Sequence, residues 1–428
     1  MKGLWALLLI AVGCSGYEPK PLEEHRMLEE LRGIKIEFPA EGLDAEQAVA
    51  IALVWNPDLR ALRREREIAE AQVVSAEAWE NPELRLNLSN LLVSSNPALA
   101  LGSALRIFPG VPGESSARVS RAEARRDEAM ARIEDGEARL AAEVRIAHGQ
   151  VRHLEETVEI VEASLGLKDK LVGLIEERMR GFVSTRHDAA SVALERSLVE
   201  RERNVVRSER EAAWGEWNAL LGLSPETRTR LKGVREAKGV EASSAEALEE
   251  ESLARRADLR VLKHQYEQAE QTLRLEHLKR VPWPRFLQPE AGDVTDVGAD
   301  GLGAGMGMEL PVFHQNGGGI AGAEAERERA RERYQAKLHA VRGEIHRARS
   351  EVEEKGRQVK LYRESLEGTV RSLDEDMRVC LEAGQIDEVA WVKCQDQALR
   401  LRLGALQAAF EYQTAVVRLD LARGAIFQ

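Results

Sequence analysis

Few residues in this sequence have the types and spacing that catalysis or metal binding requires. The three cysteines, Cys14, Cys380 and Cys394, form no Cys-x-x-Cys pair and are too few for a disulfide framework. His339 and His346 lie seven residues apart, a spacing that favours one exposed stripe of a helix over a metal pair. The sequence shows no Ser/His/Asp constellation and no phosphate-binding glycine loop. It therefore predicts no enzyme, no metal site and no cofactor.

The composition favours long helices. The chain of 428 residues has 61 Lys and Arg against 73 Asp and Glu, and this net charge of −12 opposes binding to the phosphates of nucleic acid. Only 4% of the residues are aromatic, whereas Ala, Glu, Arg and Leu are abundant, which is typical of coiled coils. Because the sequence contains no run of about 20 apolar residues, it predicts no transmembrane helix.

The N-terminus has the pattern of an export signal that ends at a cysteine. An apolar stretch from Leu4 to Val12 follows Met1-Lys2 and is too short to span a bilayer. Ala11-Val12-Gly13-Cys14 resembles the bacterial lipobox, whose cysteine is acylated, and each buried methylene of such a chain contributes about 0.8 kcal/mol. Ser15 replaces the Asp that retains lipoproteins in the inner membrane, so the resemblance implies the outer membrane. The alternative is an ordinary signal peptide with an incidental cysteine.

The rest of the chain contains an internal duplication. An offset of 200 residues aligns 45–82 with 245–282, and 11 of these 38 positions are identical. Farther along, Gly181 pairs with Gly384 and Gly222 with Gly424 at offsets of 203 and 202. The sequence therefore predicts a signal peptide at 1–13, a lipid-anchored segment at 14–42, a first repeat at 43–222, a linker at 223–244 and a second repeat at 245–428.

Both repeats predict the same succession of helices. Asn56-Pro57, an N-cap followed by a proline in the first turn, separates a short helix from one that reaches about residue 80. Uninterrupted helical patterns then run over about 117–180 and 184–221, and in the second repeat over about 258–280, 319–383 and 386–423. We expect Gly181 and Gly384 to mark the tips of two helical hairpins, where a positive φ angle lets the chain reverse.

The long helices carry apolar residues with the heptad spacing of a left-handed coiled coil. One such row, broken by Lys168, contains Leu140, Ala147, Leu154, Val161 and Ile175. In each repeat the two shorter helices together have about the length of the long one, roughly 95 Å at 1.5 Å per residue. We therefore expect two short helices, stacked end to end, to flank each long helix.

Between the helices the apolar period changes to two, which predicts strand pairs at about 82–108 and 282–313. Leu84, Leu86 and Leu88 share one face of the first pair. The stretch 282–290 contains Pro284 and Pro289, which predict a poor strand. Four strands with a lipid-facing apolar row would leave edges unpaired, so closure requires several copies. Two copies give eight strands and three give twelve, and spacing alone does not decide between them.

Taken together, these residues resemble the TolC family of outer-membrane efflux channels, in the lipoprotein branch associated with resistance-nodulation-division pumps. The similarity covers about residues 42–424. It rests on the order and duplication of Leu43–Leu59 (LDAEQAVAIALVWNPDL), Leu310-Pro311-Val312-Phe313, and the tips Gly181–Thr185 and Ala383–Asp387. The resemblance implies a mainly α fold with a small β part. Long antiparallel coiled-coil helices would form a periplasmic α-barrel, and the four strands would contribute to a trimeric, twelve-stranded outer-membrane β-barrel.

The resemblance also implies a function and its sites. The chain would be the passive outer-membrane channel of a tripartite efflux system, a homotrimer in contact with outer-membrane lipid, anchored at Cys14 and extending into the periplasm. A periplasmic adaptor protein, linked to a resistance-nodulation-division pump, would dock on Gly181, Phe182, Gly384 and Gln385.

Family channels use acidic rings near the tip, and Asp374 and Asp376 are the candidate gate residues. The alternative for these two carboxylates is a solvated helix face. The competing hypothesis for the whole chain is a non-channel, periplasm-spanning coiled-coil structural or adaptor lipoprotein.

Overall fold

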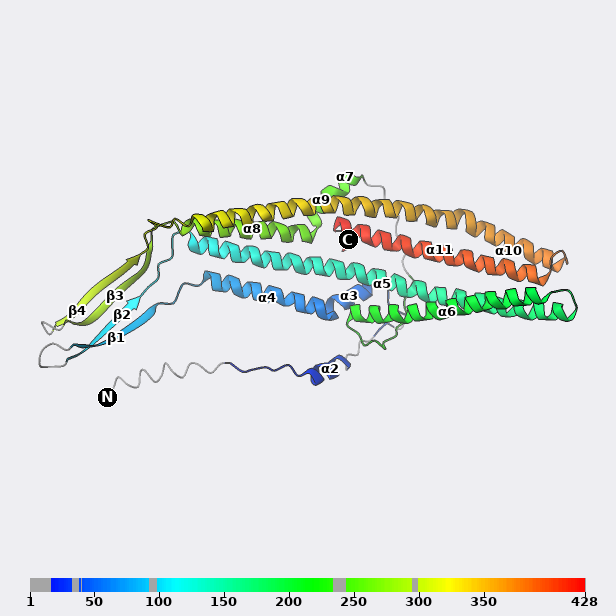
Figure 1. Cartoon of the computed structure of the whole chain (residues 1–428), viewed down its shortest axis with the longest axis horizontal. Coiled ribbons are helices and arrows are strands. Elements are labelled where there is room, and N and C mark those ends of the chain that lie inside the picture. The colour runs from blue at the N-terminus through cyan, green and yellow to red at the C-terminus, as the bar shows by residue number, and fades with distance from the viewer. Residues whose placement is uncertain are drawn as a thin grey trace.

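The computed structural model describes residues 17–32, 38–39, 41–91, 98–233, 244–294 and 299–427. The predicted signal peptide and Cys14 lie outside these described residues. The molecule is elongated, with a small sheet at one end and long helices that run to the other (Figure 1). No helix within the described ranges combines the length and the apolar character that crossing a membrane requires. A short helix that the sequence did not predict, α2 (Glu24–Arg32), buries none of its residues.

The first half of the chain begins with a capped helix pair. Asp44 accepts a hydrogen bond from the backbone N–H of Gln47 at 2.8 Å and completes a capping box. Asn56 caps the next helix, which begins at Pro57 as the sequence predicted. The elements of this half are α3 (Ala45–Trp55), α4 (Pro57–Glu77), β1 (Glu83–Leu91), β2 (Ala98–Arg106), α5 (Glu114–Arg180) and α6 (Arg186–Leu221).

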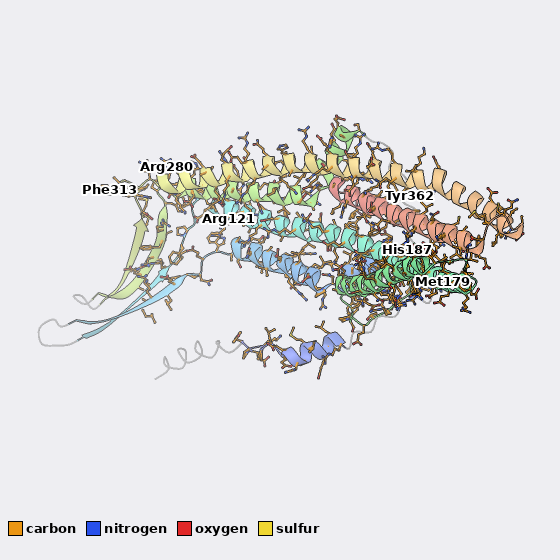
Figure 2. All side chains as sticks on the ribbon, turned by 45° about the vertical axis from the view of Figure 1, so that its right-hand side comes forward. Arg121, Met179, His187, Arg280, Phe313 and Tyr362 are labelled. Atoms are coloured by element: carbon orange, nitrogen blue, oxygen red, sulfur yellow. The ribbon has the colours of Figure 1, made fainter. Side chains whose placement is uncertain are left out.

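The second half repeats this order with one difference. Its elements are α7 (Ala245–Arg255), α8 (Ala257–Leu278), β3 (Pro284–Val294), β4 (Ala299–Met308), α9 (Gly317–Leu361), η2 (Tyr362–Leu366), α10 (Glu367–Glu382) and α11 (Glu388–Arg423). The prediction of an uninterrupted helix over 319–383 is wrong at η2, a single π-helical turn. At this turn the phenol of Tyr362 (labelled in Figure 2) lies where a Cβ of Gly404 would be, 2.6 Å from that position. The wider turn therefore lets a large ring lie directly against the backbone of α11.

The helices form a single curved layer with α5 in its centre. On the side near the sheet α5 contacts α4 and α8, and toward the far end it contacts α6 and α11. Helix α9 contacts α8 and α11 along the other side (Figure 1). Two short helices thus flank each long one, as the summed lengths predicted. The layer has two free edges, one formed by α4 and α6 and the other by α9.

Equivalent polar joints connect the short helices end to end. In the first half, Asn56 Nδ2 donates to the carbonyl oxygen of Leu220 at 2.9 Å. In the second half, Arg256 donates to the carbonyl oxygen of Ala422 at 2.8 Å. Each bond satisfies a carbonyl at the end of one helix with the side chain that precedes the next helix. The two short helices are thereby aligned along the long one.

The largest apolar core surrounds the joint of the first half, where α3, α5 and α6 meet. Trp217 is completely buried, and its ring centre lies 5.5 Å from that of His148. The imidazole Nε2 of His148 lies 3.2 Å from the carbonyl oxygen of Leu43. Burial lowers the pKa of His148, so the neutral imidazole is the stable form in this core.

The strands form one antiparallel sheet in the order β1-β2-β3-β4. The prediction of a poor strand over 282–290 is confirmed in part: β3 runs from Pro284 to Val294, but its pairing is irregular at both prolines, with a register shift between Pro284 and Phe286. Pro284 is the first residue of β3, where a missing N–H is tolerated. Leu287 exchanges backbone hydrogen bonds with Ile107, so by alternation Pro289 also directs its nitrogen toward β2. The pairing of β2 with β3 is interrupted there: Ala104 and Glu290 on one side and Ile107 and Leu287 on the other keep one register, and Pro289 between them has no partner on β2.

Candidate functional site

The candidate functional site consists of the two hairpin tips, at the end of the molecule opposite the sheet. Figure 2 shows Met179 and His187 at the tip of the first hairpin. Helix α5 ends with a bond from the N–H of Val183 to the carbonyl oxygen of Arg178, five residues back, at 2.8 Å. Such a closing bond needs a residue in the left-handed region just before its donor.

That left-handed residue is Phe182, and the prediction of a positive φ angle at Gly181 is wrong. Gly181 has a φ of −85°, whereas Phe182 has a φ of 59°. A bulky side chain in this region is strained by about 1 kcal/mol or more. The Phe182 ring is also 98% exposed. The first tip therefore presents a large apolar side chain to solvent from a strained, tightly hydrogen-bonded turn.

The second tip has the same construction with a glycine in the left-handed position. Gly384 has a φ of 68°, and the N–H of Gln385 donates to the carbonyl oxygen of Cys380 at 2.8 Å. Gly384 is therefore equivalent to Phe182, at an offset of 202 residues. The prediction that Gly384 reverses the chain is confirmed, and Gln385 is exposed beside it.

An ion pair ties the two tips together. Arg178 of α5 pairs with Asp387, the residue that caps α11. Asp387 also accepts a hydrogen bond from the N–H of Ala390 at 2.8 Å. These backbone and guanidinium bonds lower the pKa of Asp387, so its carboxylate stays ionised. The tips of the two hairpins are thus held side by side.

The structure describes the side chain of only one of the two candidate gate residues. Asp376 is exposed on α10, about two turns before Gly384. The side chain of Asp374 lies outside the described residues. One chain cannot bring a ring of carboxylates together, so the gate assignment of Asp374 and Asp376 stays a prediction.

The sheet at the opposite end has one apolar and one polar face. The alternating leucines of β1 and β2 share a face, since Leu84 pairs with Leu105. On β4 the same face carries Leu302, which is 91% exposed. On the polar face, the Arg106 guanidinium lies 4.0 Å from the ring centre of Phe286 and donates to Gln288 at 3.0 Å.

The sequence did not predict the polar link within the helical layer. Lys168, on the apolar heptad row of α5, is buried and contacts carboxylates of α6 and α11. Burial lowers its pKa, but the bonds to Asp396 and Glu195 outweigh this effect, so the pKa of Lys168 is raised and its ammonium is stable. Its signal in the sequence was the break in the heptad row. Within the described residues, no cluster of three or more His, Cys, Asp or Glu could hold a metal ion.

The overall arrangement is similar to that of several solved structures. No family model and no curated protein matches the sequence. The Campylobacter jejuni CmeC outer-membrane channel is 13% identical with a TM-score of 0.72, and the match covers 97% of this chain and 91% of that one. The open-state Neisseria gonorrhoeae MtrE outer-membrane channel is 16% identical with a TM-score of 0.73, covering 89% of this chain and 88% of that one.

The Vibrio cholerae outer-membrane protein VceC is 17% identical with a TM-score of 0.70, and the match covers 89% of this chain and 96% of that one. The chain has the fold of these outer-membrane channels. The fold class implied by the resemblance to the TolC family is confirmed: long helices carry an antiparallel four-stranded sheet at one end. In this outer-membrane-channel fold, the tips of the hairpins and the sheet lie at opposite ends of one continuous helical layer.

Proposed function

We propose that this chain is the outer-membrane channel of a tripartite efflux system, through which substrates pass passively across the periplasm and the outer membrane. The observation that carries this proposal is the open sheet. It exposes large apolar side chains on one face, including Leu84, Leu86 and Leu302, and β1 and β4 each have one unpaired edge. Unpaired strand edges are unstable in lipid, because each unsatisfied backbone group costs several kcal/mol. Further copies of the chain must therefore close the sheet.

The free edges of the helical layer support the same assembly. On one edge, α6 exposes Leu194, Leu198 and Val205 at coiled-coil spacing. On the other edge, α9 carries Ala336, Ala340 and Gly343, on the side opposite its buried row. Small residues allow another helix to approach closely. We infer a homotrimer, in which the α4 and α6 edge of one copy packs on the α9 edge of the next and the three sheets provide twelve strands.

In this proposal the tips face the pump and the sheet faces the outer-membrane lipid. A periplasmic adaptor protein docks on Gly181, Phe182, Gly384 and Gln385 and connects the channel to a pump of the resistance-nodulation-division type. The exposed Phe182 ring supports this role, because exposed aromatic residues are frequent anchors of interfaces.

Three copies of Asp374 and Asp376 around the narrow axis form an acidic ring that favours cations and resists closing through like-charge repulsion. An acyl anchor on Cys14 fastens the N-terminus to the outer membrane, and incorporation of labelled palmitate tests this part separately.

Electrophoresis of outer-membrane fractions and planar-bilayer recordings test the proposal. We expect a heat-modifiable trimeric band and a steady single-channel current. Replacing Asp374 and Asp376 by alanine should raise the conductance and weaken block by cations, and an unchanged conductance would remove the gate assignment. A monomer that is held at the membrane by its lipid and carries no current would instead identify a non-channel coiled-coil lipoprotein.

A further inference from the structure

A buried ammonium group lies where the heptad row of α5 is interrupted. Lys168 is 3% exposed, and its Nζ lies 2.9 Å from Oε2 of Glu195 in α6 and 2.8 Å from Oδ2 of Asp396 in α11. Asp396 is 5% exposed, and its Oδ1 accepts a hydrogen bond from Ser164 Oγ of α5 at 2.6 Å. We call these four residues the Lys168 cluster. The cluster joins the first hairpin, α5 and α6, to α11 of the second.

Apolar side chains enclose the Lys168 cluster on both sides along the helices. Toward the tips lies a group with members from all three helices: Leu167, Leu171, Ile175, Val192 and Val392. Away from the tips lies a second group: Val161, Leu165 and Val199. Arg400 approaches Asp396 from the outer surface, with its Nε 3.4 Å from Oδ2. The cluster is thus a charged contact within an otherwise apolar interface between three helices.

Such a contact defines the axial position of the helices more strictly than leucines do. An apolar heptad row can slip and repack, because each side chain finds an equivalent hole, whereas a buried polar residue specifies one register. A shift of α11 by one helical turn, about 5 Å, would move the carboxylate of Asp396 away from Lys168 and Ser164. Lys168 would keep only Glu195 of α6, and Asp396 only the exposed Arg400 of its own helix. Each buried charge would therefore lose its closest partner, which is unfavourable.

We propose that Lys168 is a positioning residue, which fixes α11 against α5 in the register that sets the separation of the two tips. The pair between Arg178 and Asp387 joins the same two helices ten residues nearer the tip, so the hairpins are attached at two points. One consequence rests on the proposed channel function: with three copies around the axis, this register keeps the entrance at the tips narrow.

The test replaces the buried pair by apolar side chains of similar size, in the variant Lys168→Met/Asp396→Leu. This change removes both charges together, so Asp396 is not left unpaired. Lys170→Met is the matched control, because Lys170 is exposed two residues farther along α5. Spin labels on His187 of α6 and Glu382 of α10, both exposed, report the distance between the hairpins by double electron–electron resonance. Cys380 and Cys394 are replaced by serine in every protein compared.

We expect the double variant to shift or broaden the label distance by about 5 Å, one helical turn, while Lys170→Met leaves it unchanged. In planar bilayers its open fraction should rise several-fold. An unchanged distance distribution in a folded double variant would overturn the proposal. If the double variant does not fold, Asp396→Asn provides a second test, because it removes the charge and keeps the side-chain size. An unchanged distance distribution in Asp396→Asn would also overturn the proposal. Absence of current in the unmodified protein would refute the channel function, whereas the distances would still decide the role of Lys168.

Discussion

Replacing Gly222 by alanine should destabilise the protein, whereas the same change at Gly215 should not. Gly222 ends α6 with a φ of 70°, and a Cβ there would lie 2.6 Å from the carbonyl oxygen of Trp55 and 3.1 Å from its carbonyl carbon. Both obstructing atoms belong to the backbone at the joint between α3 and α4. Gly215 lies within the same helix, and a Cβ there would meet no atom within 4 Å. The same substitution is thus made twice in one helix, but only at position 222 does the added Cβ meet a positive φ angle and nearby backbone atoms.

The two substitutions should change the free energy of unfolding in opposite directions. A left-handed alanine costs roughly 1–2 kcal/mol. Forcing a methyl group against a fixed backbone adds about 1–3 kcal/mol, so the free energy of unfolding should fall by about 2–5 kcal/mol in Gly222→Ala. In Gly215→Ala it should rise by about 0.5–1 kcal/mol, because alanine loses less backbone entropy on folding than glycine.

Circular dichroism at the helical band, followed against temperature in detergent, measures both variants against the unmodified protein. We expect the melting midpoint to fall for Gly222→Ala and to rise slightly for Gly215→Ala. Equal midpoints for the two variants would refute the argument, because they would mean that the close contact with Trp55 imposes no constraint at the joint.

Three further predictions concern the charged joint, the sheet and the first tip. Burial raises the pKa of Asp258, but the bonds to Arg256 and Lys337 outweigh this effect and lower the pKa to about 2. Its stabilising effect is therefore complete above pH 3.8 and is lost as the pH falls through about 2, and Asp258→Asn should lose on the order of 2 kcal/mol in urea unfolding at pH 7. Gly307→Ala should displace the Phe286 ring, which lies 2.3 Å from the position of the added Cβ, and should lower the melting midpoint more than alanine at other glycines of β4. Phe182→Gly should relieve about 1 kcal/mol of backbone strain and raise the midpoint, yet weaken capture of the adaptor in pull-down assays; tighter capture would contradict the docking role.

Most of the fold could be predicted from the sequence because its signals are local and repeated. The Asn56-Pro57 pair, the heptad rows and the alternating leucines each predict an element without reference to distant residues. The position of the first tip was missed because glycine permits a positive φ angle but does not require one. The N-caps of the helices that follow the tips, Thr185 and Asp387, are 202 residues apart. Aligning the two tips at this offset places Phe182 opposite Gly384 and would have predicted the left-handed residue correctly.

The remaining differences depend on contacts between distant segments. Strand β3 continues through Pro289 because it stays paired with β4 there, and the π-turn at Tyr362 depends on Gly404 of another helix. The partners of Lys168 could not be predicted, because Glu195 and Asp396 come from helices whose relative positions the sequence does not define. In the candidate site, the tips could be placed from the sequence, whereas the bonds that hold them together could not.

The two end-to-end joints use different chemistry, one a neutral amide and the other a charged guanidinium, and this gives the halves unequal responses to acid. The joint at Asn56 uses a neutral amide, which has no proton to gain in acid. The joint at Arg256 depends on ionised Asp258, whose pKa is lowered to about 2. Protonation of Asp258 therefore weakens the joint of the second half only. In the first half, acid affects His148, whose buried neutral imidazole must become charged as the pH falls below its usual pKa of 6.5. Two matching parts of one molecule thus loosen under different conditions: the first half begins to lose stability in mild acid, and the second only as the pH falls below 3.8 toward about 2.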